Sequence, residues 1–204
     1  MKHAVRRFKS LRVALKELEP FIRAATPLQS GRPFKNFGDM RPREALVNWL
    51  ICAAYNAQGA EQLSFTSDPT GGDGILHHAT SDRTWLTEHV MVPPAPQGEK
   101  SDIQALILKA VESKIQKGGS AYASGKTLMV FLEAGGDAEW FPNRVAKALP
   151  NTDFAGVWVV GLHHVEGGEY IYGVAQLDVS GGDAPTWAVH ISRDFETWKV
   201  TRLQ

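Results

Sequence analysis

The chain has 204 residues, of which 43% are hydrophobic and 22% are charged. These proportions are typical of a globular protein with one well-buried core, and they exclude a disordered chain, a collagen and a coiled coil. A single cysteine, Cys52, excludes an internal disulfide framework and a zinc site built from cysteines.

The sequence contains no run that resembles a membrane span or an export signal. Its longest apolar run, residues 154–162, is far shorter than the roughly 18 residues of a transmembrane helix. The first 20 residues carry six Lys or Arg residues and no apolar stretch of the kind found in secretory signals. We therefore expect a cytoplasmic protein that does not act at a membrane.

The formal net charge is zero, but the charges are unevenly distributed. Residues 1–50 hold 11 Lys/Arg against 4 Asp/Glu, whereas residues 51–204 hold 11 against 18. A basic N-terminal arm on an acidic body predicts an anionic partner such as nucleic acid. The alternative is a basic helix that docks on its own acidic domain, and the sequence alone leaves both open.

Periodicity and composition divide the chain near residue 41. Apolar residues recur every three or four positions from Phe8 to Leu18, which predicts one apolar stripe on a helix. Residues 24–41 are rich in glycine, proline, serine and arginine, a composition typical of a linker. We predict a basic N-terminal helix and linker at residues 1–41, and a single α/β domain at residues 42–204.

Helices and strands alternate within the second region. A helix predicted at residues 43–57 is apolar around most of its circumference, so it should be buried. A second helix is predicted at residues 102–117, with Gly118-Gly119 ending it. The predicted strands cover residues 62–66, 74–78, 84–92, 127–133, 155–162, 170–177 and 187–191, with a short helix at residues 140–149. The expected fold class is α/β, a mixed β-sheet with flanking helices.

Two acidic residues fall where a hairpin would bring them together. Asp73 precedes the strand at residues 74–78, and Glu88 lies within the next strand, on the face that also carries Leu86 and Val90. Two antiparallel neighbours can place these carboxylates side by side, and paired hard oxygen ligands suit Mg²⁺ or Mn²⁺. The alternative is that Asp73 shapes a glycine-rich turn and Glu88 pairs with a nearby lysine.

The order of these elements, with Asp73 in a Gly-Asp-Gly turn and Glu88 in the run Thr-Glu-His-Val, resembles the PD-(D/E)XK nuclease-like superfamily across residues 43–163. The resemblance implies a restriction-endonuclease-like core (α-β-β-β-α-β) followed by extra C-terminal strands. Val90 stands where the family usually carries its lysine, and Lys114 on the following helix matches branches that supply the lysine from there. The implied activity is Mg²⁺- or Mn²⁺-dependent hydrolysis of a phosphodiester in nucleic acid. The implied metal ligands are Asp73 and Glu88, and Lys114 completes the implied catalytic set.

Two further segments each admit two interpretations. Glu44 resembles an extra acid that some members of the superfamily carry, and it also suits the first turn of a helix, where the helix dipole favours a carboxylate. Gly125-Lys126-Thr127 matches the last residues of a phosphate-binding loop motif. That motif lies between a strand and a following helix, whereas here a helix is predicted before it and a strand after it. We therefore expect Lys126 to begin a strand close to the acids.

A second function, from a different class, stays open at this point. The same fold without the activity would serve as an interaction or regulatory module, and either protein could be a homodimer. Convergence of Asp73, Glu88 and a lysine amine within about 4–6 Å of one point would favour the enzyme. A Glu88 neutralised by a buried lysine or arginine, with no open coordination position, would favour the module.

Overall fold

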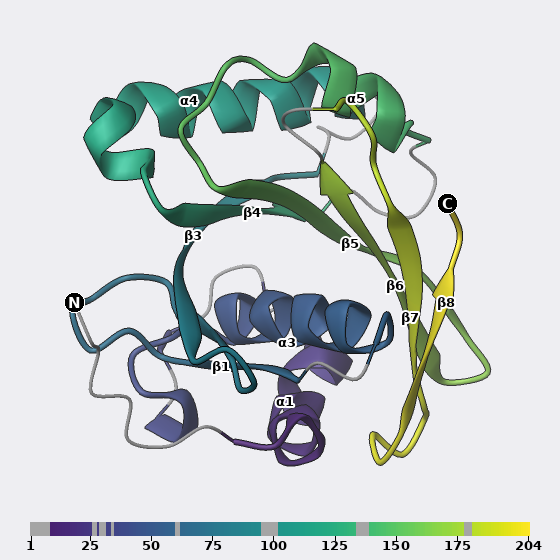
Figure 1. Ribbon diagram of the computed structural model, residues 1–204. Helices are drawn as coiled ribbons and strands as arrows, with labels where there is room; N and C mark the ends of the chain where they lie inside the picture. The colour runs from purple at the N-terminus through teal and green to yellow at the C-terminus, as the bar shows by residue number, and fades with distance from the viewer. Residues whose placement is uncertain are drawn as a thin grey trace.

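A computed structural model describes residues 9–25, 28, 32–33, 35–59, 62–94, 102–133, 139–177 and 181–204. In these ranges the chain forms one mixed β-sheet with helices on both faces, as Figure 1 shows. The α/β class predicted from the sequence is confirmed. No helix in the described part of the chain is both long and apolar enough to cross a membrane.

The sheet has eight strands that lie side by side in the order of the sequence. They are β1 (Leu63–Thr66), β2 (Ile75–His78), β3 (Arg83–Val92), β4 (Lys126–Leu132), β5 (Gly156–Glu166), β6 (Glu169–Leu177), β7 (Thr186–Ile191) and β8 (Trp198–Arg202). Strands β3, β4 and β5 are mutually parallel, and every other neighbouring pair is antiparallel. The predicted hairpin of β2 and β3 is confirmed.

The sheet curls around one group of helices and carries a second group on its outer face (Figure 1). On the concave side lie α1 (Leu11–Ala24) and α3 (Pro42–Asn56), and on the outer side lie α4 (Ile103–Ala123) and α5 (Pro142–Ala148). A 3₁₀ turn, η1 (Lys35–Phe37), precedes α3. Helices α4 and α5 are the crossovers that parallel strands require.

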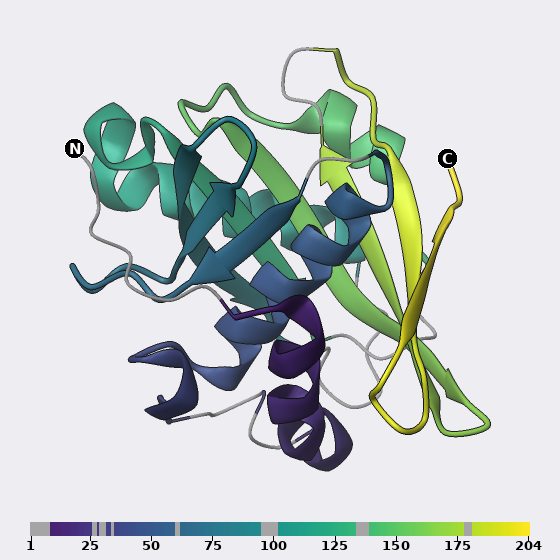
Figure 2. The same ribbon diagram turned by 60° about the horizontal axis from the view of Figure 1, so that its bottom comes forward.

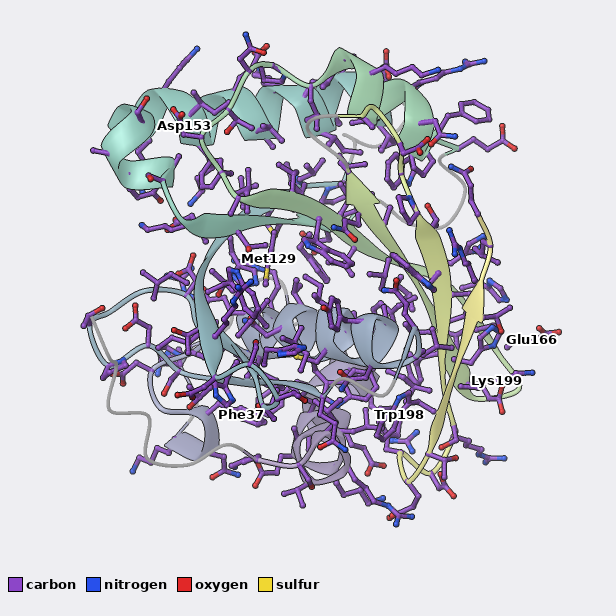
Figure 3. All side chains as sticks on the ribbon, viewed as in Figure 1. Phe37, Met129, Asp153, Glu166, Trp198 and Lys199 are labelled. Carbon is purple, nitrogen blue, oxygen red and sulfur yellow. The ribbon has the colours of Figure 1, made fainter. Side chains whose placement is uncertain are left out.

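Strand alternation divides the buried side chains into two cores. In β4, Leu128 and Val130 face α4, whereas Met129 and Phe131 face α3. Met129 can be followed in Figure 3, where it points from the sheet toward α3. The central strand is therefore apolar on both faces, as expected for a sheet that is covered on both sides.

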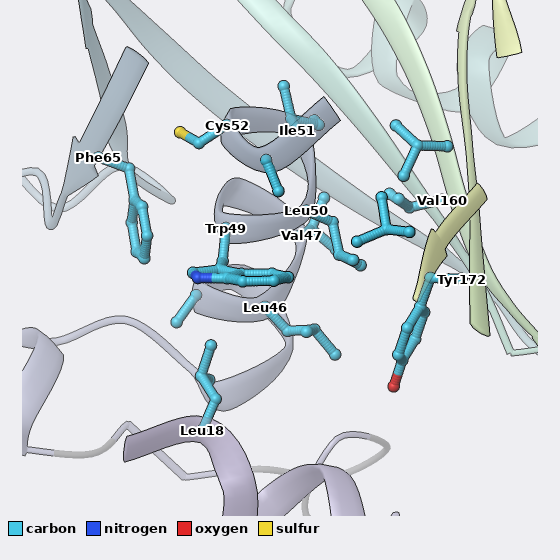
Figure 4. Packing of buried hydrophobic residues seen from close by; sticks show 14 of the residues in the cluster. Leu18, Leu46, Val47, Trp49, Leu50, Ile51, Cys52, Phe65, Val160 and Tyr172 are labelled. Atoms are coloured by element: carbon cyan, nitrogen blue, oxygen red, sulfur yellow. The ribbon is translucent and has the colours of Figure 1, made fainter. Parts of the chain in front are cut away.

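Helix α3 is the centre of the concave core, because 12 of its residues are buried. Figure 4 shows Trp49 of α3 with Leu18 of α1 on one side and Phe65 of β1 on another. This confirms the prediction of a buried helix from its nearly continuous apolar sequence. A helix covered on one side by the sheet and on the other by α1 needs apolar residues around most of its circumference.

Helix α1 packs across α3 (Figure 2) and belongs to the same hydrophobic core. Leu15 and Leu18 are fully buried, and the Trp49 indole N–H donates a hydrogen bond to the Leu11 carbonyl at 2.7 Å. On the solvent side, Lys16 forms an ion pair with Glu196 at 3.1 Å. The described part of the basic N-terminal region is thus docked on the body of the protein.

Candidate functional site

Asp73 lies just before the start of β2, against the neighbouring strand β3. The Thr87 N–H donates to the Gly74 carbonyl at 2.9 Å, so the ladder between the two strands reaches one residue beyond β2. Asp73 then accepts a hydrogen bond from the backbone N–H of His89, with 2.7 Å between the nitrogen and Oδ2. This bond ties the Asp73 carboxylate to β3 at His89, the residue that follows Glu88.

Gly74 makes this placement of Asp73 sterically possible. Its φ of +147° lies in a region that residues with a side chain rarely adopt. A Cβ there would lie 2.9 Å from both the Asn48 amide nitrogen and the Thr87 hydroxyl. Glycine at this position therefore lets the hairpin approach α3 closely, and the Gly-Asp-Gly turn fixes where Asp73 emerges.

Glu88 points to the outer face of the sheet, where α4 covers it. Lys114 of α4 donates to Glu88 Oε1 across 2.5 Å, and the two side chains are only 14% and 12% exposed. Burial alone would raise the pKa of Glu88, but the hydrogen bond and charge of Lys114 outweigh it, and the pKa is lowered. The lysine predicted for this site thus lies in direct contact with one of the two predicted acids.

Two further residues lie near Glu88: Lys126, which was expected close to the acids, and Tyr122, which was not. Lys126 begins β4, and its Nζ lies 3.7 Å from Glu88 Oε2 and 3.9 Å from the centre of the Tyr122 ring. Tyr122 lies close enough to Glu88 to help lower the pKa of that carboxyl, and burial together with Glu88 raises the pKa of the phenol. The strand-start position of Lys126 was predicted, but no feature of the sequence indicated Tyr122.

Asp73 and Glu44 are the other two acids of the site. Burial raises the pKa of Asp73, the His89 N–H opposes this, and the charge of Glu88 raises the pKa further. Burial also raises the pKa of Glu44, whose Oε2 accepts a 2.8 Å hydrogen bond from the Arg41 N–H. Glu44 therefore serves as the reciprocal partner in the N-terminal cap of α3, which agrees with the interpretation of Glu44 as a first-turn acid.

Behind Asp73 lies a group of buried polar side chains between β3 and α3. Both ring nitrogens of His89, Asn48 Oδ1 and Thr87 Oγ1 lack a hydrogen-bond partner among the described residues. His89 Nδ1 lies 3.9 Å from Asp73 Oδ2, and burial lowers the pKa of the imidazole to about 3. His89 is therefore neutral near pH 7.

Asp73 and Glu88 are the two carboxylates at this site that could hold a divalent cation. In the described ranges there is no group of three or more His, Cys, Asp or Glu side chains that could hold a metal ion. Mg²⁺ needs fewer protein ligands than zinc or calcium, because it is commonly bound by one or two carboxylates together with water and substrate phosphates. Asp73 and Glu88 could act in this way. Burial is the main cause of the raised pKa of Asp73, and a bound cation would oppose the smaller contribution from the charge of Glu88.

Other candidate groups lie away from the two acids. His77 pairs with Asp82 at 3.2 Å, and His78 contacts Ser81, so both histidines are engaged at the far end of β2. Residues 1–8 of the predicted basic arm lie outside the described residues.

Comparison with known proteins leaves the family open: no protein-family model matches the sequence, and no curated protein is significantly similar to it.

Proposed function

We propose that the chain is a metal-dependent phosphodiesterase of the PD-(D/E)XK type that acts on nucleic acid. The observation that carries the proposal is the contact of Lys114 with Glu88, beside Asp73. The three side chains come from three different elements, α4, β3 and the start of β2. Their meeting on one patch favours a site over a set of unrelated surface charges.

The order of the elements supports the same proposal. Helix α3, the meander β1-β2-β3, helix α4 and the parallel strand β4 follow one another in the α-β-β-β-α-β order. In this arrangement the two acids belong to the hairpin and the lysine to the next helix. The extra strands β6–β8 extend the sheet on the side away from the acids.

Asp73 and Glu88 would hold Mg²⁺ or Mn²⁺, and such an ion activates water and neutralises charge on a phosphate. The His89 N–H keeps the Asp73 carboxylate fixed for this task. The ammonium group of Lys114, beside Glu88, can donate a hydrogen bond to an oxygen that gains negative charge. The basic residues that precede α1 would attract the nucleic acid backbone by its phosphates.

One observation favours the alternative of an interaction or regulatory module with the same fold. Glu88 already has a lysine near each of its oxygens, Lys114 at 2.5 Å and Lys126 at 3.7 Å. A carboxylate that is permanently neutralised in this way needs no metal ion. Metal binding therefore decides between the two functions.

The test is calorimetric titration of Mg²⁺ and Mn²⁺ into the wild type, Asp73→Asn and Glu88→Gln, followed by cleavage assays on plasmid and single-stranded DNA. We expect binding in the wild type, its loss in both variants, and metal-dependent nicking only in the wild type. Glu112→Gln, an exposed acid of α4, is the matched control and should behave as the wild type does. Metal binding without cleavage of DNA or RNA would favour the module, and no binding by the wild type would refute the metal site.

A further inference from the structure

Helix α4 contains a break whose geometry serves Tyr122. Gly119 has a φ of +62° and a ψ of −164°, which is not helical. A Cβ on Gly118 would lie 2.4 Å from the Cβ of Tyr122 and 2.6 Å from its Cγ. Two consecutive glycines weaken a helix, so their presence at this point calls for a compensating role. They allow the last turn of α4 to bring Tyr122 back against Gly118 and toward the acids.

Tyr122 in turn supports Lys126. The ammonium group of Lys126 lies 3.9 Å from the centre of the Tyr122 ring, within the range of a cation–π interaction. The close packing of Tyr122 against Gly118, at the break in α4, fixes the ring in place. The ring therefore holds Lys126 next to the acids without using any of the three N–H donors of its ammonium group for a hydrogen bond.

The two lysines at Glu88 are bound differently. Lys114 makes a direct hydrogen bond of 2.5 Å, whereas Lys126 is 3.7 Å from Oε2, beyond hydrogen-bond distance. Lys126 is also the more exposed of the two, at 23% against 14%. Of the two cations, Lys126 is the one that can leave Glu88 at low cost and present its donors to a ligand.

The charges around Glu88 indicate the condition under which Lys126 leaves Glu88 and contacts a ligand. Asp73 and Glu88 carry two negative charges, and Lys114 and Lys126 carry two positive ones, so these four groups have no net attraction for a phosphate. A divalent cation on the two acids would leave the four groups and the ion with a net charge of plus two. Lys126 would then be repelled by the ion and drawn to a phosphate oxygen.

We propose that Tyr122 and Lys126 form a phosphate-binding pair that engages the substrate backbone only when a divalent cation occupies Asp73 and Glu88. The inference rests on the proposed function and adds to it a specific coupling between metal and substrate. Lys126 is assigned a contact with a non-esterified phosphate oxygen, and Tyr122 is a positioning residue that acts through Lys126. The coupling is reciprocal, so a bound phosphate backbone also strengthens metal binding.

The experiment measures DNA affinity by the fluorescence anisotropy of a labelled 12-nucleotide strand, with and without Mg²⁺ and in parallel with Ca²⁺. The length of the strand is checked on a gel afterwards. We expect the cation to strengthen binding to the wild type by about fivefold or more, which is the lower end of common coupling. Lys126→Ala should lose most of this gain and should bind as the wild type does without the cation. For Lys126→Ala in Mg²⁺, the slope of log affinity against log salt should decrease by about one, which corresponds to one lost phosphate contact.

Three variants separate a phosphate contact from a structural role. Lys126→Arg keeps the charge and should retain most of the gain. Tyr122→Leu removes the ring and should behave like Lys126→Ala, whereas Tyr122→Phe keeps the ring and should retain more of the coupling. Lys117→Ala, an exposed lysine of the same helix, is the matched control and should leave the gain unchanged.

The outcomes distinguish this inference from the proposed function. If Lys126→Ala keeps the full gain from the cation while calorimetry shows normal metal binding, the phosphate-binding pair is refuted and the metal site stands. A wild type that binds the cation but gains no DNA affinity from it refutes the pair in the same way. A wild type that binds neither Mg²⁺ nor Ca²⁺ refutes both.

Discussion

Lys114 of α4 and Glu88 of β3 form an ion pair of 2.5 Å that is almost enclosed, with side-chain exposures of 14% and 12%. The pair joins the outer helix to the sheet next to His89, whose N–H holds Asp73. Two such charges are costly to remove from water, and their mutual attraction and further hydrogen bonds offset that cost. Removing one partner alone therefore has a larger effect than removing both.

We predict that Lys114→Met destabilises the fold by about 2 kcal/mol in urea unfolding. A lost partner in a fully buried pair costs about 3–5 kcal/mol. Here Lys126 still lies 3.7 Å from Glu88 Oε2, which reduces the cost.

The double variant Lys114→Met with Glu88→Leu should recover much of the loss, since no buried charge is left unpaired. Lys117→Met, on the exposed side of α4, should change the free energy of unfolding by less than about 0.5 kcal/mol. Equal losses in the single and double variants would contradict the pairing.

The shifted pKa values predict opposite effects of the two acids on stability. The pKa of Asp73 is raised, mainly by burial, so its ionised form costs stability at neutral pH. The pKa of Glu88 is lowered, so its ionised form stabilises the fold above the unfolded-state pKa near 4.5, and this is lost as the pH falls through the folded-state pKa. Asp73→Asn should therefore raise the free energy of unfolding at pH 7, and Glu88→Gln should lower it.

The dependence of the free energy of unfolding on pH checks the sign of the Asp73 effect. The advantage of Asp73→Asn over the wild type should shrink as the pH falls through the raised pKa and should vanish below about 3.8, the ordinary value for an aspartate. Urea unfolding from pH 3 to pH 8 measures this. A variant that is less stable than the wild type at pH 7 would show that Asp73 has a structural role instead.

The sequence was sufficient to predict that Asp73 and Glu88 lie on neighbouring antiparallel strands. The positions of Asp73 and Glu88 depend on local sequence signals. These are a glycine-rich turn before one strand and an alternating pattern in the next strand. Lys114 could be assigned only through the resemblance, because the distance from a helix to a strand depends on how α4 packs on the sheet. Periodicity identifies which face of a helix is buried, but it carries no information about which strand that face will cover.

Three features could not be predicted from local patterns. Gly118-Gly119 is an ordinary helix stop, and the additional turn that carries Tyr122 forms only because it packs back on the site. Pro20 lies within α1, which continues to Ala24 because Pro20 is exposed and Ile22 beyond it is buried. Strand β8 is a short edge strand with only Trp198 and Val200 partly buried against the core, so its alternation is too weak to detect.

Divalent cations should stabilise the wild type without any substrate. A ligand that binds only the folded state adds about 2.7 kcal/mol at a concentration of 100 times its Kd. We expect Mg²⁺ to raise the melting temperature of the wild type and of Glu112→Gln, but not of Asp73→Asn or Glu88→Gln. Differential scanning fluorimetry across a Mg²⁺ series measures this, and an equal rise in all four proteins would indicate weak binding elsewhere.

The basic N-terminal segment can be tested by its removal. Residues 1–8 include Lys2, Arg6 and Arg7, while the cations of α1 already pair with acids of the protein, as Lys16 does with Glu196. Deletion of residues 1–8 should leave the melting temperature unchanged. It should weaken DNA binding and reduce the slope of log affinity against log salt by about two to three, close to one unit per lost phosphate contact. An unchanged slope would contradict a role for the arm in binding nucleic acid.

The break in α4 gives the sharpest structural prediction. Gly118→Ala places a methyl group where Tyr122 now lies, so either the break shifts or Tyr122 moves away from Glu88. We expect a loss of about 1–3 kcal/mol in the free energy of unfolding, the range for overpacking a tight site. Gly59→Ala meets no atom within 4 Å and should be neutral within about 0.5 kcal/mol. If Gly118→Ala folds normally and retains the coupling between Mg²⁺ and DNA, then the coupling does not depend on where this turn holds Tyr122.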